Sequence, residues 1–185
     1  MNLRNIAFIE QCMRTKSEIT APKINFDETH AIMGMIDEGL DFALAATLND
    51  LPNVIEEAGD FLWFCALFSN ATNIEIEAIE PEETAIPLQV LNVIISSGKK
   101  LLAYPTVDRD EQLEKIRVAA GKFLWLMLSL IVVNNQDDFE SAQKRCEETV
   151  IKKLKVRYPD KFQSRLALTR DLDSEREVLE NATKH

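Results

Sequence analysis

Four acidic residues form two pairs whose spacing suits a shared site. Glu38 and Asp41 are three residues apart, and so are Glu57 and Asp60. On a helix, residues at this spacing lie on one face. A stop-and-restart signal at residues 49–52 would fold the two helices antiparallel, which brings the two pairs to a similar height. We therefore expect the four carboxylates to converge on one point between the helices.

Such a cluster would be costly without a bound cation. Residues 31–46 are apolar apart from glycine and acids, and residues 61–68 are apolar throughout. Repulsion and desolvation of several carboxylates would be unfavourable there unless a positive charge neutralised them. Oxygen ligands suit Mg²⁺, for which Mn²⁺ can substitute, and such an ion can bridge phosphate oxygens and activate water. The alternative is that the acids form a solvated helix face.

Basic and aromatic residues could complete a nucleotide site. Lys153 and Arg157 share a helix face and could clamp phosphates, or they could simply complement the helix dipole. Trp63 could stack on a base, with core packing as the alternative for it and for Trp125. Lys122 could hold a triphosphate tail or be a solvated surface lysine. The other lysines with the same two interpretations are Lys99 and Lys100.

The elements that would position these residues are helices. With only five Gly and six Pro, the chain lacks the turn residues of a many-stranded β fold. No segment alternates convincingly between polar and apolar residues, and residues 69–86 are expected to form a linker. The helices are expected at about 3–15, 27–48 with Asp27 as its cap, 53–68, 87–104, 109–133, 138–156 and 171–181.

An internal repeat refines this all-α prediction. Residues 58–68 and 120–130 share the pattern Gly-x-Phe-Leu-Trp, and residues 32–36 resemble residues 90–94. Chance similarity is the alternative to two tandem helical hairpins, which would form a four-helix core with a pseudo-two-fold axis. The second hairpin has Ser96, Lys99, Ala119 and Lys122 in place of the acids, so it is expected to be degenerate.

The chain is therefore expected to form a single all-α domain over residues 1–185. Its parts would be a catalytic hairpin at about 27–69, the degenerate repeat at about 87–134, and a C-terminal helix and tail at 138–185.

Composition limits the expected partners and compartment. The formal net charge of −10 disfavours nucleic acid and anionic membranes as partners. The N-terminus does not resemble a signal peptide, and the longest apolar run, residues 123–133, falls short of the roughly 20 residues needed to span a bilayer. Three widely separated cysteines are typical of a reduced protein. We expect a cytoplasmic protein with no membrane partner.

Several segments together resemble one enzyme family. Residues 30–41 and 56–63 carry the acidic pairs, residues 153–162 contain Arg-Tyr-Pro, and residues 170–176 end the similarity. These segments resemble the MazG-like family of the all-α nucleoside triphosphate pyrophosphatase superfamily, which has dimeric dUTPase-like relatives. The resemblance covers roughly residues 28–70 and 145–180.

The resemblance implies Mg²⁺-dependent cleavage of a nucleoside triphosphate, in particular a deoxynucleoside triphosphate, into a monophosphate and pyrophosphate. It implies metal ligation by Glu38, Asp41, Glu57 and Asp60, with Glu38 or Glu57 orienting or deprotonating the attacking water. Asp41 departs from the family's Glu, and Val150 departs from its frequent Asn. These departures favour the alternative of a non-catalytic helical module that binds a nucleotide or a protein. Family members are often dimers or tetramers, so the resemblance also implies a homodimer. The base, the sugar and the number of phosphates of the substrate stay open.

Overall fold

All regular structure in the described part of the chain is helical. The computed structural model describes residues 12–14, 21–82, 85–160, 163, 165 and 172–182. Its principal helices are α2 (Phe26–Leu48), α3 (Leu51–Thr72), α4 (Pro87–Ala103), α5 (Arg109–Asn135), α6 (Phe139–Arg157) and α8 (Leu172–Ala182). The all-α prediction is confirmed. The helix expected at about residues 3–15 lies largely outside the described residues, and within it residues 12–14 are helical.

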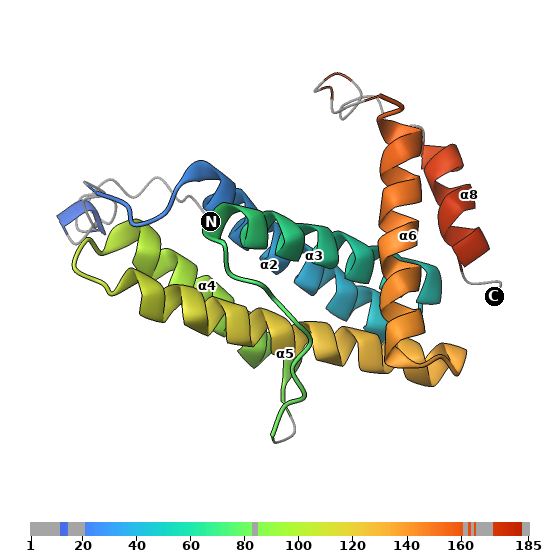
Figure 1. Ribbon diagram of the computed structural model, residues 1–185, viewed down its shortest axis with the longest axis horizontal. Coiled ribbons are helices and arrows are strands. Elements are labelled where there is room, and N and C mark those ends of the chain that lie inside the picture. The colour runs from blue at the N-terminus through green and yellow to red at the C-terminus, as the bar shows by residue number, and fades with distance from the viewer. Residues whose placement is uncertain are drawn as a thin grey trace, which may run out of the picture.

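Two antiparallel hairpins form the body of the molecule (Figure 1). Helices α2 and α3 make the first hairpin and α4 and α5 the second, and α2 packs on α4 while α3 packs on α5. Helix α6 crosses α3 and the end of α5, and α8 lies beside α6. The core between these helices is filled by large apolar side chains, including the fully buried Phe61, Phe68 and Phe123.

The start of α2 differs from the expectation. Asn25 caps the helix in place of Asp27: its side chain accepts a hydrogen bond from the Glu28 amide, and the Glu28 carboxylate accepts one from the Asn25 amide. This reciprocal capping box satisfies two amides that the first turn leaves unpaired. The turn to α3 passes through Asn49 at a φ of 55°, and Asp50 then caps α3.

Two glycines allow close packing at equivalent repeat positions. A Cβ on Gly59 of α3 would lie 2.7 Å from the carbonyl oxygen of Cys146 on α6. A Cβ on Gly121 of α5 would lie 2.4 Å from the carbonyl oxygen of Glu77. The extended chain after α3 crosses α5 here, and the Ile79 amide donates to the Gly121 carbonyl over 2.9 Å. The repeated glycine thus admits α6 on one hairpin and an extended segment on the other.

Helix α5 combines the composition of a membrane span with a position in the core of the molecule. It is long and apolar enough to cross a membrane, with a mean hydropathy of 1.9 over its most apolar window. The uninterrupted apolar run expected from the sequence, residues 123–133, is only 11 residues long and is therefore shorter than the apolar part of this helix. Half of the window is buried inside the molecule, where α5 packs against α4, α3 and α6. A core helix of this kind carries the same composition as a membrane span.

Candidate functional site

Three of the four expected carboxylates meet between α2 and α3. Glu38 and Asp41 lie one turn apart on α2, Glu57 faces them from α3, and each offers an oxygen within 4.8 Å of the others. In octahedral Mg²⁺ sites the ligand oxygens lie about 2.1 Å from the ion, so they are roughly 3 to 4 Å from one another. Small side-chain rotations would therefore suffice to hold the ion. The donor set of carboxylate oxygens fits Mg²⁺ or Mn²⁺.

Burial is the main cause that raises the pKa of both glutamates. The pKa of Glu57 rises to about 9, because burial, the hydrogen bond with Glu38 and the charge of Glu56 all favour its protonated form. The pKa of Glu38 rises to about 7, since burial outweighs the opposing hydrogen bond with Glu57. At neutral pH the pair shares a proton, as crowded acids do when no cation is present.

The fourth expected ligand, Asp60, is held by a lysine. The Lys153 ammonium from α6 donates to the Asp60 carboxylate and also to Glu56 Oε1, over 3.0 Å. Lys153 is only 2% exposed. Burial disfavours its charge, but Asp60 and Glu56 outweigh burial and raise its pKa. For Asp60 burial dominates, so its pKa is raised in spite of Lys153.

A cavity beside the acids gathers most of the other expected site residues. It has a volume of about 280 Å³ and lies where α6 meets α2 and α3. Glu38 and Asp60 form its acidic side, so it opens directly onto the carboxylate cluster. The remaining lining residues are His30, Trp63, Phe64, Lys153, Leu154, Arg157 and Tyr158.

The two tryptophans of the repeat have different surroundings. Trp63 is 38% exposed and lines the cavity, with its ring 4.9 Å from that of Phe64 and 6.3 Å from that of His30, both edge-on. Trp125 instead packs against Phe139 at the start of α6, 5.8 Å between ring centroids. Of the two tryptophans, Trp63 is therefore the one that lines the cavity.

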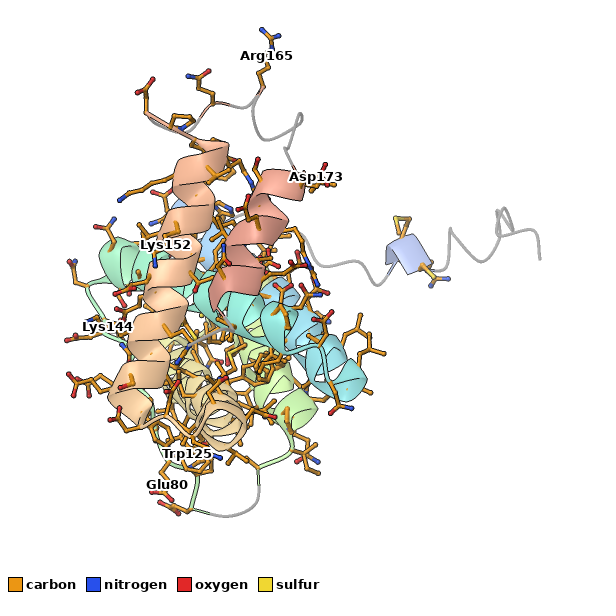
Figure 2. All side chains as sticks on the ribbon, turned by 90° about the vertical axis from the view of Figure 1, so that its right-hand side faces the viewer. Glu80, Trp125, Lys144, Lys152, Arg165 and Asp173 are labelled. Carbon is orange, nitrogen blue, oxygen red and sulfur yellow. The ribbon has the colours of Figure 1, made fainter. Side chains whose placement is uncertain are left out.

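Arg157 is anchored by the last described helix. Its guanidinium donates to both oxygens of Glu175 on α8, over 2.9 and 2.6 Å, and Glu175 is buried. This bidentate pair is the main cause that raises the pKa of Arg157. Figure 2 shows α8 running alongside α6, which is what places Glu175 against Arg157. Arg157 is therefore fixed at the cavity wall with its charge largely offset.

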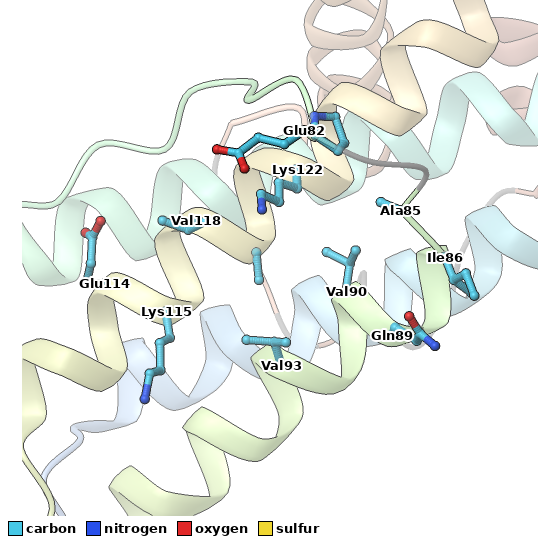
Figure 3. A pocket seen from close by; sticks show the side chains of 12 residues that line it. Glu82, Ala85, Ile86, Gln89, Val90, Val93, Glu114, Lys115, Val118 and Lys122 are labelled. Carbon is cyan, nitrogen blue, oxygen red and sulfur yellow. The ribbon is translucent and has the colours of Figure 1, made fainter.

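Lys122 lies apart from the cluster. It lines a separate cavity of about 560 Å³ between α4, α5 and the chain that leads into α4 (Figure 3). Its neighbours there include Val118, Lys115 and Val90. The structure thus brings Lys153, Arg157 and Trp63 together with the acids and leaves Lys122 on the other hairpin.

Two further residues shape the site and were not expected. Glu56 shares Lys153 with Asp60, and Glu175 anchors Arg157. The role of Glu56 could have been expected from the sequence. Glu56 and Asp60 are four residues apart on α3 and so lie on one face of that helix, just as Lys153 and Arg157 lie on one face of α6. Val150 is buried in the contact between α6 and Gly59. Packing against α3 therefore accounts for an apolar residue at position 150.

Comparison with known proteins found no relative: no family model matches the chain, and no curated protein or solved structure matches it. What the site can do is therefore inferred from its own residues and geometry.

Proposed function

We propose that this protein is a Mg²⁺-dependent pyrophosphohydrolase that cleaves a nucleoside triphosphate, in particular a deoxynucleoside triphosphate, to a monophosphate and pyrophosphate. The observation that supports this most is the group formed by Glu38, Asp41 and Glu57, whose oxygens lie within 4.8 Å of one another beside a cavity. The MazG-like resemblance belongs to the same proposal. So do a degenerate second hairpin, a cytoplasmic setting and the absence of membrane or nucleic-acid partners.

Each residue of the site has a role in this proposal. Glu38, Asp41 and Glu57 would hold the ion, which when bound would neutralise phosphate charge and activate water. Asp60 could join them only by exchanging its bond with Lys153. Glu38 also lines the cavity, so it is the better placed of the two glutamates to orient or deprotonate a water molecule there.

The rest of the cavity suits the remainder of a nucleotide. Lys153 and Arg157 would bind phosphate oxygens by exchanging bonds that they make with Asp60 and Glu175, and Trp63 offers a partly exposed ring for a base. The volume of about 280 Å³ is close to the lower end of the range for small-molecule sites, roughly 300–1,000 Å³. A nucleotide would therefore extend from the cavity toward the acidic cluster with its triphosphate.

Pyrophosphate release tests the proposal directly. Purified full-length protein would be assayed with Mg²⁺ or Mn²⁺ against the common ribo- and deoxynucleoside triphosphates, together with Glu57→Gln and Asp37→Asn. Asp37 is an exposed acid on α2 outside the cluster, so its variant is the matched control. We expect turnover of one or a few nucleotides that survives Asp37→Asn and falls at least 100-fold in Glu57→Gln. Equal turnover in both variants would exclude the acidic cluster as the catalytic centre.

A second candidate is a helical module that binds a nucleotide or a protein without turnover. The observation that favours it is the bond between Lys153 and Asp60, which occupies the fourth carboxylate. Folded protein that binds nucleotide with metal present but releases no pyrophosphate would support this candidate.

A further inference from the structure

The second hairpin has a cavity of its own, lined by α4, α5 and the chain that leads into α4 (Figure 3). We call it the α4–α5 cavity. Its volume of about 560 Å³ lies within the range of small-molecule sites, roughly 300–1,000 Å³. None of its lining residues belongs to the acidic cluster or to the cavity beside that cluster. It is therefore a separate candidate binding site.

The α4–α5 cavity lies at the repeat equivalent of the acidic site. Ala119 and Lys122 on its α5 wall stand where α3 has Glu57 and Asp60. Its cover is equivalent too, since the extended chain after α3 crosses α5 at the repeated glycine, just as α6 crosses α3. The second hairpin thus keeps a cavity on this face but has exchanged two acids for an apolar residue and a base.

Lys122 is the charged residue of the α5 wall that lacks a partner. It is partly buried, and it makes no hydrogen bond or ion pair with any residue that the structure describes. The two other charged residues of this wall are paired on their own helix, Lys115 with Glu111 and Glu114 with Arg117. A partly buried ammonium without a partner would be stabilised by a bound anion.

The rest of the wall is mostly aliphatic. Figure 3 shows Val90 and Val93 on α4 and Val118 on α5 around Lys122. No aromatic ring lines the cavity among the described residues, so a nucleotide base would have no stacking partner there. Glu82, in the chain before α4, is exposed, so water weakens the effect of its charge. These surroundings suit a hydrocarbon body next to one anionic group.

We propose that the α4–α5 cavity binds a small amphipathic anion, a molecule that carries a carboxylate or a phosphate on a hydrocarbon body. Lys122 would donate to the anionic group, while the three valines would cover the hydrocarbon. Burial of the hydrocarbon should strengthen binding up to about fourfold for each methylene. This site is independent of the metal and nucleotide chemistry proposed for the first hairpin.

Isothermal titration calorimetry of the full chain tests this proposal. The anionic probes are octanoate and octyl phosphate, and 1-octanol is the neutral probe of the same chain length. We expect a dissociation constant of about 1 mM or lower for at least one anion, and tighter binding of octanoate than of hexanoate. The tighter of the two octyl anions identifies the anionic group.

Two lysine variants locate the bound anion. Lys122→Met should weaken anion binding about 10-fold or more, because the charged hydrogen bond is lost, and should leave the affinity for 1-octanol nearly unchanged. Lys99→Met is the matched control, since Lys99 is an exposed lysine of α4 outside the cavity, and it should bind the anions as the unmodified chain does. Val118→Phe, which places a larger side chain in the cavity, should weaken all the octyl probes.

Circular dichroism and urea unfolding would establish that the three variants are folded. Absence of binding by both octyl anions at about 10 mM would overturn the proposal, and so would equal affinities for them in Lys122→Met and the unmodified chain. Lys99 lines a small apolar groove between α2 and α4. An anion affinity that falls in Lys99→Met and not in Lys122→Met would therefore place the ligand in that groove and would also overturn the proposal.

Discussion

Lys153 on α6 donates hydrogen bonds to Asp60 and Glu56 on α3, so the basic and acidic sides of the cavity are directly tied to each other. The close approach of α6 to α3 depends on Gly59, where a side chain would meet the carbonyl of Cys146. The position of Lys153 on the cavity wall is therefore set by the contact between the backbones of α3 and α6, and it does not depend on the conformation of a loop.

Removal of the buried lysine should destabilise the fold. Lys153→Met would leave two partly buried carboxylates, 14% and 20% exposed, without their buried partner, and breaking a buried ion pair costs about 3–5 kcal/mol. We expect a loss near 3 kcal/mol in the free energy of urea unfolding at neutral pH, and a smaller loss at acidic pH, where Asp60 can take up a proton. Lys152→Met is the control, because Lys152 is exposed and should cost less than about 0.5 kcal/mol. Equal losses in the two variants would contradict the buried pairing.

Bound metal should raise the melting temperature. A ligand that binds only the folded chain stabilises it by about 1.4 kcal/mol at tenfold excess over its dissociation constant, which corresponds to roughly 3–6 °C here. Asp41→Asn should abolish the shift, since Asp41 is exposed and its loss should leave the core intact. The shift should persist in Asp37→Asn. Differential scanning calorimetry with Mg²⁺, Mn²⁺ or EDTA measures it, and a shift that survives Asp41→Asn would place the metal elsewhere.

Metal-free protein should lose stability as the pH rises. Glu57 has a pKa of about 9 in the folded chain against an ordinary value of 4.5, so the folded state holds a proton that the unfolded state has released. Stability from this group is full below about pH 4.5 and is lost as the pH approaches 9, with Glu38 adding to the loss up to about pH 7.

Glu57→Gln should flatten this dependence. We expect the difference in unfolding free energy between weakly acidic and alkaline buffer to shrink by roughly 1–3 kcal/mol, after allowance for solvent screening. Urea titrations in EDTA, with Asp37→Asn alongside, give the comparison. An unchanged pH slope in Glu57→Gln would show that Glu57 titrates normally.

The two tryptophans offer a matched test of base stacking. Trp63→Ala removes a ring from the cavity, whereas Trp125→Ala removes the equivalent ring of the second hairpin, which packs on Phe139. If a nucleotide base stacks on Trp63, its loss should raise KM about 10-fold or more, as expected for a stacking energy of roughly 1–3 kcal/mol. Trp125→Ala should leave KM near the unmodified value. Similar KM values in both variants would indicate that Trp63 serves packing alone.

The helices and the meeting of three acids followed from local rules. The i, i+3 spacing on α2 and the short turn at Asn49 were enough to bring Glu38 and Asp41 against Glu57. The end of α3 differed from the expectation: the helix extends to Thr72, four residues beyond the expected end near residue 68. Its cap there is Asn73 at a φ of 59°, a conformation that Asn tolerates well and that only the backbone reveals.

The partners of the acids depended on tertiary packing. Nothing local distinguishes Lys153, which is buried against Asp60, from Lys122, which lies in a separate cavity on the other hairpin. Both are lysines within helices, and their different surroundings follow from how α6 crosses α3. The repeat aligned Lys122 with Asp60. That alignment did not indicate that Asp60 would form its ion pair with Lys153.

The chain order of the site also has a consequence in time. Asp60 precedes Lys153 by 93 residues. At synthesis rates of about 5–20 residues per second, the acidic hairpin leaves the ribosome on the order of 5–20 s before its ammonium partner. During that interval the carboxylates have no lysine to neutralise them, so protons and dissolved divalent cations have first access to the cluster.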